Sequence, residues 1–364
     1  MTRVEVSLKK LEDRSYTIHI GYKCLDRLCE ILSEIPLNSV FVITDRNVEK
    51  LWAGKIIALL EKRFPYRGLI SVEPGEEQKN LLTIEKLARK LVSMKADRAS
   101  TIIAVGGGVI GDIAGFLASI FLRGVSFINI PTTLLAQVDS SVGGKTGVDL
   151  PEGKNLVGTF YQPVLVFADV DFLSTLPHEE FLNGMSEVIK YGIIMDTEFF
   201  TFLESNVEKI LEKEPDILIK IVSQSCKLKR EIVEKDEKEA GLRRILNFGH
   251  TIGHSIEAAS NYRIKHGWAV SMGMVAASYL ALEYGMTEPE EVKRIENLID
   301  RFGLPSRVPE DLTADEIVQG LTYDKKMVDS KLRWILPTKI GSVNVVEGIK
   351  TDDVINVLRR LKGR

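Results

Sequence analysis

The first half of the chain alternates short apolar runs with amphipathic segments. The apolar runs are rich in β-branched residues, and the segments between them repeat apolar residues every three or four positions. The predicted strands are residues 4–6, 16–20, 40–44, 68–72, 101–105 and 126–130, and the predicted helices are 25–33, 46–60, 82–94 and 110–121. Short strands that alternate with helices predict a parallel α/β sheet.

Helical spacing dominates after about residue 176, as in the series Ile210, Leu211, Ile217 and Leu218. At 364 residues, the chain is also long for a single core. We therefore predict a Rossmann-like α/β domain with a parallel-rich sheet over residues 1–176 and an all-helical domain over 177–364. The segment 169–177 is the predicted hinge, and the cleft between two such domains is the default place for a ligand.

Composition is that of an ordinary soluble globular protein, with 45% apolar and 27% charged residues and a net charge of −3. This balance predicts no general attraction to nucleic acid or to a membrane surface. The three cysteines form no CxxC pair, and the first residues lack the apolar stretch of a signal peptide. These features favour a cytoplasmic protein with free thiols. We interpret the apolar run 268–284 as a buried helix, because it is short for a bilayer span.

A glycine-rich turn follows the predicted strand at 101–105. Gly106, Gly108 and Gly111 satisfy G-x-G-x-x-G, a pattern that lets a phosphate approach a helix N-terminus, although a plain strand-to-helix turn explains it equally well. The acid expected about 20 residues downstream is absent. Asp45 ends an earlier strand and could bind a ribose, but a helix N-cap is the simpler interpretation. The stretch 140–149, SSVGGKTGVD, lacks Walker spacing yet could hold an oxyanion beside Lys145.

Three of the five histidines fall in the stretch 247–268, NFGHTIGHSIEAASNYRIKHGW. His250 and His254 are spaced to share a helix face, but Thr251 replaces the glutamate of a metalloprotease. Two or three histidines with one carboxylate form a common catalytic zinc set, and Glu187 in an apolar helical segment is the candidate carboxylate. Ordinary hydrogen-bonded histidines, and a simple Glu187–Lys190 ion pair, remain the alternatives.

Longer motifs resemble the 3-dehydroquinate synthase family. They are EPGEEQK, GGGVIGD, RGVSFINIPTTLLAQVDSSVGGKTGVD, GKN, NGMSEVIK, GLRRILNFGHTIGHSIEA and KHGWAVSMGM, in order from about residue 45 to residue 326. Glycerol dehydrogenases and other sugar-phosphate cyclases are similar in domain plan, with weaker agreement in the motifs. The resemblance implies an NAD-binding domain, a helical metal- and substrate-binding domain, and a homodimer.

The resemblance also implies roles for individual residues. The metal ligands, for zinc or cobalt, would be Glu187, His250 and His266, so that His254 faces the substrate instead. The NAD contacts would be Asp45, Asn47, Glu76, Lys79, Gly107, Gly108, Val109, Asp112, Thr132, Thr133, Leu135, Lys154 and Thr175. The substrate shell would be Arg123 from a partner subunit, Asp139, Lys145, Asn155, Lys190, Lys229, Arg243, Asn247, His254 and Lys326.

The reaction that the resemblance implies is the conversion of 3-deoxy-D-arabino-heptulosonate 7-phosphate to 3-dehydroquinate and phosphate, in the shikimate pathway. NAD would be reduced and reoxidised in each turnover, around an elimination and an intramolecular aldol step. Another sugar-phosphate cyclase and a metal-dependent polyol dehydrogenase are the alternative enzymes. A non-catalytic NAD- or phosphate-binding module is disfavoured, because buried charges are costly to keep without chemistry.

Overall fold

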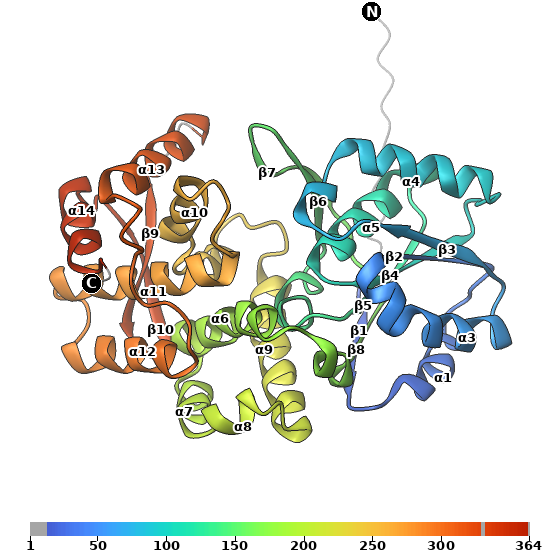
Figure 1. Cartoon of the computed structure of the whole chain (residues 1–364), viewed down its shortest axis with the longest axis horizontal. Coiled ribbons are helices and arrows are strands. Elements are labelled where there is room, and N and C mark those ends of the chain that lie inside the picture. The colour runs from blue at the N-terminus through green and yellow to red at the C-terminus, as the bar shows by residue number, and fades with distance from the viewer. Residues whose placement is uncertain (1–12, 329–331, 363–364) are drawn as a thin grey trace, which may run out of the picture.

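The computed structural model describes residues 13–328 and 332–362, without the side chains of residues 322–328. The strand predicted at 4–6 lies outside these residues. A half that contains the main sheet and a half built mostly of helices lie side by side (Figure 1). Among the described residues, no helix combines the length and the apolar character needed to cross a bilayer.

The strands and helices follow the predicted alternation from β1 to β5, whereas the strands β6, β7 and β8 were not predicted. The strands are β1 (Thr17–Gly21), β2 (Ser39–Asp45), β3 (Tyr66–Val72), β4 (Ser100–Gly106), β5 (Ser126–Pro131), β6 (Lys145–Leu150), β7 (Gly153–Phe160), β8 (Leu165–Asp169), β9 (Arg333–Lys339) and β10 (Ser342–Glu347). The helices are α1 (Leu28–Leu32), α2 (Arg46–Val48), α3 (Gly54–Arg63), α4 (Leu81–Ser93), α5 (Gly108–Ile120), α6 (His178–Met195), α7 (Thr197–Ser205), α8 (Val207–Leu211), α9 (Pro215–Lys235), α10 (His250–Ala259), α11 (His266–Glu283), α12 (Pro289–Arg301), α13 (Ala314–Val328) and α14 (Thr351–Arg360). Short helical turns are η1 (Leu25–Arg27), η2 (Glu49–Ala53), η3 (Glu76–Gln78), η4 (Phe121–Arg123), η5 (Ala136–Ser140), η6 (Val170–Thr175) and η7 (Leu242–Asn247).

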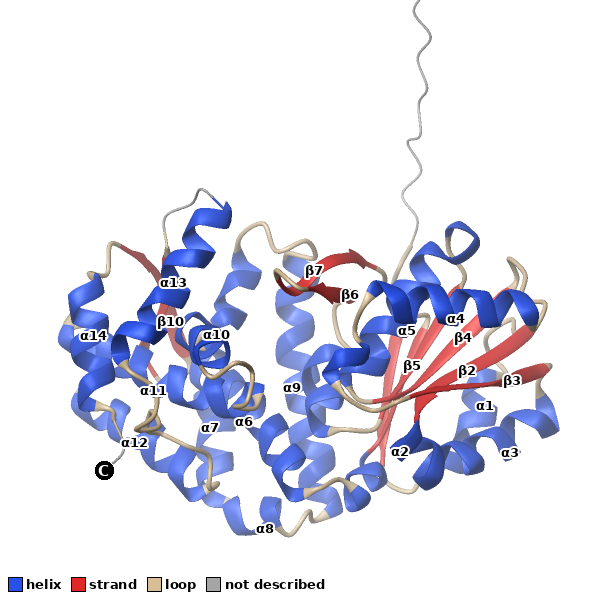
Figure 2. Ribbon diagram, turned by 45° about the horizontal axis from the view of Figure 1, so that its top comes forward, coloured by secondary structure: helices blue, strands red, loops and turns tan. Residues whose placement is uncertain are grey.

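The main sheet is parallel, with strand order β1-β8-β5-β4-β2-β3. Its interior strands are largely apolar on both faces because helices cover both faces of the sheet, as Figure 2 shows. In β2, Phe41 and Ile43 pack in the core beneath α4 and α5, while Val40 and Val42 point into the core beneath α1 and α3. The period of two in the sequence thus becomes two separate apolar layers.

The strand order reverses between β2 and β4. After β2 the chain moves outward to the edge strand β3, and after β4 it moves the opposite way to β5. In an open α/β sheet, the loops at the carboxyl ends of two such strands diverge and leave a crevice for a ligand. Asp45 and Gly107, both predicted to bind the cofactor, stand at these two strand ends.

The second half encloses one apolar core, to which α6 and α9 to α14 all contribute. Helix α11 is buried along most of its length, as predicted for residues 268–284. The expectation of an all-helical second half was incomplete, because β9 and β10 form an antiparallel hairpin that packs against α11. An apolar run as short as that of β9 carries no periodicity that separates a strand from a buried helical turn.

A second antiparallel hairpin, β6–β7, extends from the first half toward the second (Figure 1). Its strands include the second half of SSVGGKTGVD and the end of PEGKN, so Lys145, Lys154 and Asn155 all lie on it. The sequence pattern predicted a phosphate-binding loop here rather than strands. The hairpin places these polar side chains between the two halves.

Candidate metal and cofactor site

The three predicted metal ligands come from three helices of the second half. Glu187 lies in the middle of α6, whereas His250 and His266 are the first residues of α10 and α11. Helices α10 and α11 approach at backbone distance, since a Cβ atom on Gly273 would lie 2.0 Å from the carbonyl oxygen of Gly249. Glycine at these positions therefore allows the close approach of the two histidine-bearing helices.

The ligand atoms of these residues face one another. The Oε1 atom of Glu187 lies 3.5 Å from Nε2 of His250 and 3.9 Å from Nε2 of His266. The three ligand atoms lie within 4.8 Å of one another. Two ligands of a tetrahedral zinc ion are about 3.4 Å apart, by the usual bond lengths. The spacing therefore fits a shared divalent ion.

The fit is supported by an unsatisfied oxygen. Glu187 is 1% exposed, and its Oε1 atom has no hydrogen-bond partner within the described part of the chain. An unpaired buried carboxylate oxygen costs free energy, which a bound cation would offset. The other oxygen, Oε2, accepts a hydrogen bond from the ammonium of buried Lys190. The predicted ion pair is thus present, and it leaves Oε1 for a metal.

The histidine nitrogens have fixed roles. Nδ1 of His250 lies 3.1 Å from the carbonyl oxygen of Phe248, which can only accept, so Nδ1 carries the proton and Nε2 presents a lone pair. Burial, with the nearby positive charge of Lys190, lowers the pKa of His250 well below its usual value. His250 is therefore neutral at pH 7, as a metal ligand requires.

His254 lies one turn along α10 from His250 and is exposed. With Glu257 and His266 it forms a second cluster of possible ligand atoms. In that cluster, however, the oxygens of Glu257 already accept hydrogen bonds from His266 and Lys154. The cluster around Glu187 is therefore the better metal site, and His254 borders it.

A buried group of charges adjoins the metal cluster. Asp139, in η5, accepts hydrogen bonds from Lys229 Nζ at 2.8 Å and from the Tyr191 hydroxyl at 2.6 Å. Burial opposes ionisation of Asp139, but Lys229 and Lys190 outweigh it and hold its pKa well below the usual range. Burial lowers the pKa of Lys229, although Asp139 works against this shift. Asp139 therefore remains ionised at neutral pH.

Arg243 is 1% exposed and has an unusual set of partners. Its guanidinium donates to the carbonyl oxygens of Gly143 and Glu237, and its Nε has no partner among the described residues. No carboxylate of the described chain forms an ion pair with it. A buried cation bonded mainly to neutral carbonyls favours an anionic ligand.

Lys145, Asn247 and Glu239 meet at the seam between the halves. The carboxylate of Glu239 accepts a hydrogen bond from Lys145 and another from Asn247 Nδ2 at 3.1 Å. Burial works against ionisation of Glu239, but its bond with Lys145 lowers its pKa. Sequence reasoning selected the first two residues and missed Glu239, because its run EKDEKE is typical of a solvated surface.

The predicted cofactor residues gather at the carboxyl ends of β2 to β5. Asp45 caps α2 by accepting from the backbone N–H groups of Asn47 and Val48 at 2.8 and 3.0 Å. Both bonds use Oδ1, so the capping role is compatible with a ribose bound by Oδ2. The other members at these strand ends are Glu76 and Lys79 after β3, Gly107, Gly108, Val109 and Asp112 after β4, and Thr132, Thr133 and Leu135 after β5. Two further members lie elsewhere, Lys154 on β7 and Thr175 at the end of η6.

Helix α5 begins at Gly108, the last of three consecutive glycines, with Gly107 as an N-cap that offers no side-chain hydrogen bond. Its first N–H groups therefore suit a phosphate. Lys79 is buried and pairs with Asp112 at 2.6 Å. The Thr132 hydroxyl is buried and has no partner among the described residues, whereas Thr175 accepts from the Trp52 indole at 2.8 Å.

Arg123 and Lys326 are the predicted substrate residues that no contact of the described chain joins to this cluster. Arg123 is exposed in the turn after α5, where Leu122, Arg123 and Gly124 all have positive φ. Lys326 belongs to α13, but its side chain lies outside the described residues. Asn155, on β7, accepts a hydrogen bond from Lys79 and thus lies on the cofactor side.

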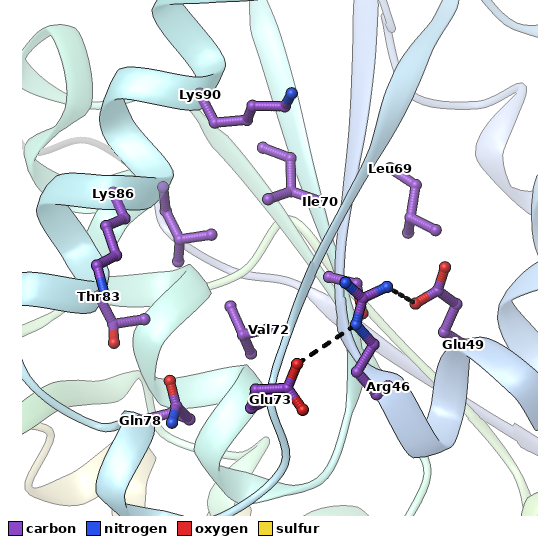
Figure 3. Close-up of a pocket in the computed structure, with 12 residues that line it drawn as sticks. Arg46, Glu49, Leu69, Ile70, Val72, Glu73, Gln78, Thr83, Lys86 and Lys90 are labelled. Atoms are coloured by element: carbon purple, nitrogen blue, oxygen red, sulfur yellow. Dashed lines mark hydrogen bonds and ion pairs between the residues drawn. The ribbon is translucent and has the colours of Figure 1, made fainter.

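A separate pocket of about 500 Å³ lies at the outer edge of the sheet. It is bordered by β3, by α4 and by the helical residues that follow β2 (Figure 3). Arg46 crosses it to contact Glu49 at 3.1 Å and Glu73 at 3.6 Å. None of the predicted metal or substrate residues lines this pocket. The clustered chemistry is therefore elsewhere, at the seam between the halves.

Family models match most of the chain in two adjoining pieces. The model described as 3-dehydroquinate synthase N-terminal matches residues 69–183, and that described as 3-dehydroquinate synthase C-terminal matches residues 184–327. The chain belongs to the 3-dehydroquinate synthase family. The 3-dehydroquinate synthase of Thermodesulfovibrio yellowstonii is 44% identical over 96% of this chain and 98% of its own length. That of Acetivibrio thermocellus is 46% identical over 92% of each chain.

Solved structures with this fold include other cyclases of sugar phosphates. The 2-epi-5-epi-valiolone synthase of Streptomyces hygroscopicus, solved with NAD⁺ and Zn²⁺, has a TM-score of 0.90 at 26% identity and covers 98% of this chain and 99% of its own. A 2-deoxy-scyllo-inosose synthase, solved with carbaglucose-6-phosphate, NAD⁺ and Co²⁺, has a TM-score of 0.87 at 29% identity and covers 95% of this chain and 96% of its own. The predicted fold of the 3-dehydroquinate synthase family is thereby confirmed.

Proposed function

We propose that the protein converts 3-deoxy-D-arabino-heptulosonate 7-phosphate to 3-dehydroquinate and phosphate, using NAD and one divalent metal ion, zinc or cobalt. The observation that carries this proposal is the buried Oε1 atom of Glu187, which lacks a hydrogen bond and faces the Nε2 atoms of His250 and His266. Membership of the 3-dehydroquinate synthase family supplies the reaction.

The proposed substrate carries a carboxylate and a phosphate, and the seam offers cations to match. Arg243, Lys190 and Lys229 are all buried, and Lys145 lies at the start of β6, in the β6–β7 hairpin. Arginine can bind either anion with two parallel hydrogen bonds, while lysines act as point charges. A protein of net charge −3 needs such a local cluster to concentrate a doubly anionic ligand.

The proposed reaction oxidises the C5 hydroxyl of the substrate, eliminates phosphate, reduces C5 again and closes the carbocycle by an intramolecular aldol step. When bound, the metal ion supplies Lewis-acid polarisation of substrate oxygens, and NAD supplies a hydride acceptor that is regenerated in each turnover. The metal would be held by Glu187, His250 and His266, and the NAD pyrophosphate by the N-terminus of α5.

The other residues orient the substrate and handle protons. Lys190 holds Oε2 of Glu187, so that Oε1 points toward the histidines. Asp139, kept ionised by Lys229, is an acceptor for substrate hydroxyls. His254, at the border of the metal cluster, is a base within reach of the same substrate. Arg243 neutralises the charge that develops on oxygen as phosphate leaves, whereas Lys145 contributes to binding of the anionic substrate.

We further propose a cytoplasmic homodimer whose chains have a domain boundary at residues 176/177, with Arg123 reaching the partner's site. The strained turn places Arg123 in the chain beside Leu122 and near Ile120, two exposed apolar residues that a partner subunit could cover. A mixture of Arg123→Ala and Glu187→Gln subunits tests this. Hybrid dimers contain one complete site if Arg123 acts in the partner, so activity should recover on mixing; no recovery contradicts the proposal.

In the decisive experiment, the protein is supplied with metal and NAD, and the heptulosonate phosphate is its sole substrate. We expect one phosphate released per 3-dehydroquinate formed, identified by NMR, without net accumulation of NADH. Net NADH would indicate a polyol dehydrogenase. Turnover of a sugar phosphate without a carboxylate, but not of the heptulosonate phosphate, would indicate a valiolone- or deoxyinosose-type cyclase and would overturn the proposal.

A further inference from the structure

Glu257 is a buried carboxylate that the reaction above does not use. It lies on α10, one turn beyond His254, and is 2% exposed. Each of its oxygens has a different partner: Oε2 lies 3.0 Å from Nδ1 of His266, and Oε1 accepts from Nζ of Lys154 at 3.1 Å. A carboxylate buried to this degree is costly unless both oxygens are satisfied, and here both are.

The contact with His266 fixes which ring nitrogen can bind a metal. An ionised carboxylate can only accept, so Nδ1 of His266 donates, and in the neutral ring that binds a metal the lone pair is on Nε2. That Nε2 atom is the one that lies 3.9 Å from Oε1 of Glu187. A carboxylate behind a histidine ligand orients the ring and makes it a stronger ligand. For His250, the carbonyl oxygen of Phe248 occupies the same place.

The contact with Lys154 comes from the other half of the molecule. Lys154 lies on β7, and its ammonium is also 3.9 Å from Glu76 and 4.8 Å from the ring centroid of Tyr262. Lys154 and Glu76 both belong to the proposed cofactor site. Glu257 therefore connects a metal ligand of the helical half with the cofactor side of the β6–β7 hairpin.

We propose that Glu257 is a positioning residue, which orients His266 for metal binding and joins this ligand to the cofactor site through Lys154. The proposal rests on the proposed function, because it requires a metal ion at Glu187, His250 and His266. If Glu257 were only an ion-pair partner that stabilises the fold, its replacement would change the free energy of unfolding but not the affinity or geometry of the metal site.

The test measures Co²⁺ binding to the full chain in the absence of NAD, by competition with a chelator and by the visible absorption of the bound ion. Glu257→Gln keeps an acceptor but removes the charge, and Glu257→Ala removes both. We expect about 10-fold weaker binding for the first and up to about 100-fold for the second, with a changed Co²⁺ spectrum. Glu257→Asp should recover part of the affinity.

The matched control is Glu179→Gln. Glu179 is exposed and accepts a hydrogen bond from Lys265, the residue before His266, without contact to the ring. Its replacement should leave Co²⁺ affinity within about twofold, as expected for an exposed ion pair. Thermal unfolding of the metal-free variants shows whether each is folded, and the conservative Glu257→Gln variant keeps the test valid if Glu257→Ala does not fold.

Lys154→Met tests the connection between the halves. Without NAD present, it should weaken Co²⁺ binding by about 2- to 5-fold, and its effect should be smaller in the Glu257→Gln background, since both changes remove one interaction. Wild-type protein that binds Co²⁺ while the Glu257 variants bind it equally well, with an unchanged spectrum, overturns this inference alone. Wild-type protein that binds no Co²⁺ overturns the proposed function as well.

Discussion

The two halves of the molecule present their polar groups in different ways. In the sheet half, the proposed cofactor residues lie at the carboxyl ends of strands whose side chains form two apolar cores. Glycines and the N-terminus of α5 provide much of the proposed cofactor-binding surface. In the helical half, Glu187, Lys190 and His250 are side chains buried within one continuous region of packed helices. Charges buried in this way depend on one another, whereas groups at a strand end act more independently. Changes in the helical half should therefore be the more damaging.

The largest effect should follow from losing a metal ligand. We expect His250→Ala and Glu187→Gln to lose bound metal and to lower activity by more than about a thousandfold, because two remaining ligands hold a divalent ion poorly. Metal content by mass spectrometry and turnover of the heptulosonate phosphate measure the two effects. Glu187→Gln also leaves Lys190 buried without its anion, at a cost of about 3–5 kcal/mol in the free energy of unfolding.

His178→Ala is the control for these variants. His178 is exposed at the first residue of α6, the helix that carries Glu187. The His178→Ala variant should keep both its bound metal and its activity. Full activity in a chelator-treated His250→Ala protein would show that the buried cluster of the helical half is not a metal site.

The second-largest effect is expected from replacing Asp139, which forms an ion pair with Lys229 between the two halves. Asp139→Asn should lower the free energy of unfolding at pH 7 by about 3 kcal/mol, because Lys229 is left buried without its anion. In the wild type, the pKa of Asp139 is depressed. Its contribution is therefore fully present above the ordinary aspartate pKa of about 3.9 and is lost progressively as the pH falls from there to the lower folded value. Denaturant unfolding at pH 7 and below pH 4 should show the gap between variant and wild type narrowing in acid. An equal gap at both pH values would contradict the ion-pair explanation.

A smaller effect is expected for Lys145, on the hairpin of the sheet half. Lys145→Ala should lower kcat/KM by about 10-fold, mostly through KM, because an exposed ammonium contributes to binding of the anionic substrate rather than to the core. Steady-state kinetics measure this, with exposed Lys209→Ala as the control. Unchanged kcat/KM would remove Lys145 from the substrate shell.

The smallest effect should come from the cofactor side. Lys154→Ala should raise the NAD concentration needed for half-maximal activity several-fold. An effect of this size is expected when one partly exposed charge contact to a phosphate is lost. The measurement is an NAD titration at saturating metal, so that weaker metal binding does not contribute. An unchanged NAD requirement would argue that Lys154 serves the helical half alone.

The fold of the sheet half could be predicted because its strands follow a simple local rule. Residues that alternate between two buried faces, with turns between them, define β2 to β5 without any knowledge of contacts. The β6–β7 hairpin was missed because the run GGKTG in SSVGGKTGVD is typical of a phosphate-binding loop. The β9–β10 hairpin was missed because one short apolar strand among helices has no period of its own.

The residues of the candidate site were harder to predict from local sequence patterns. Spacing alone paired His250 with His254, since they share a helix face, and the apolar surroundings of Glu187 marked it as the candidate carboxylate. Only the family resemblance chose His266 rather than His254 as the second histidine ligand. Glu239 bonds to Lys145 of β6 and Glu257 to Lys154 of β7, 94 and 103 residues away in the sequence. Such long-range contacts leave no periodic signal, so neither glutamate differs from a surface acid in the sequence.

The most direct test of the account removes the metal and returns it. Activity on the heptulosonate phosphate, measured as phosphate release in the presence of NAD, should fall to background after chelator treatment. It should return in proportion to added Zn²⁺ or Co²⁺, up to one ion per chain. Full turnover by protein that contains no metal would contradict the central claim, that the carboxylate and two imidazoles of the helical half hold a catalytic ion.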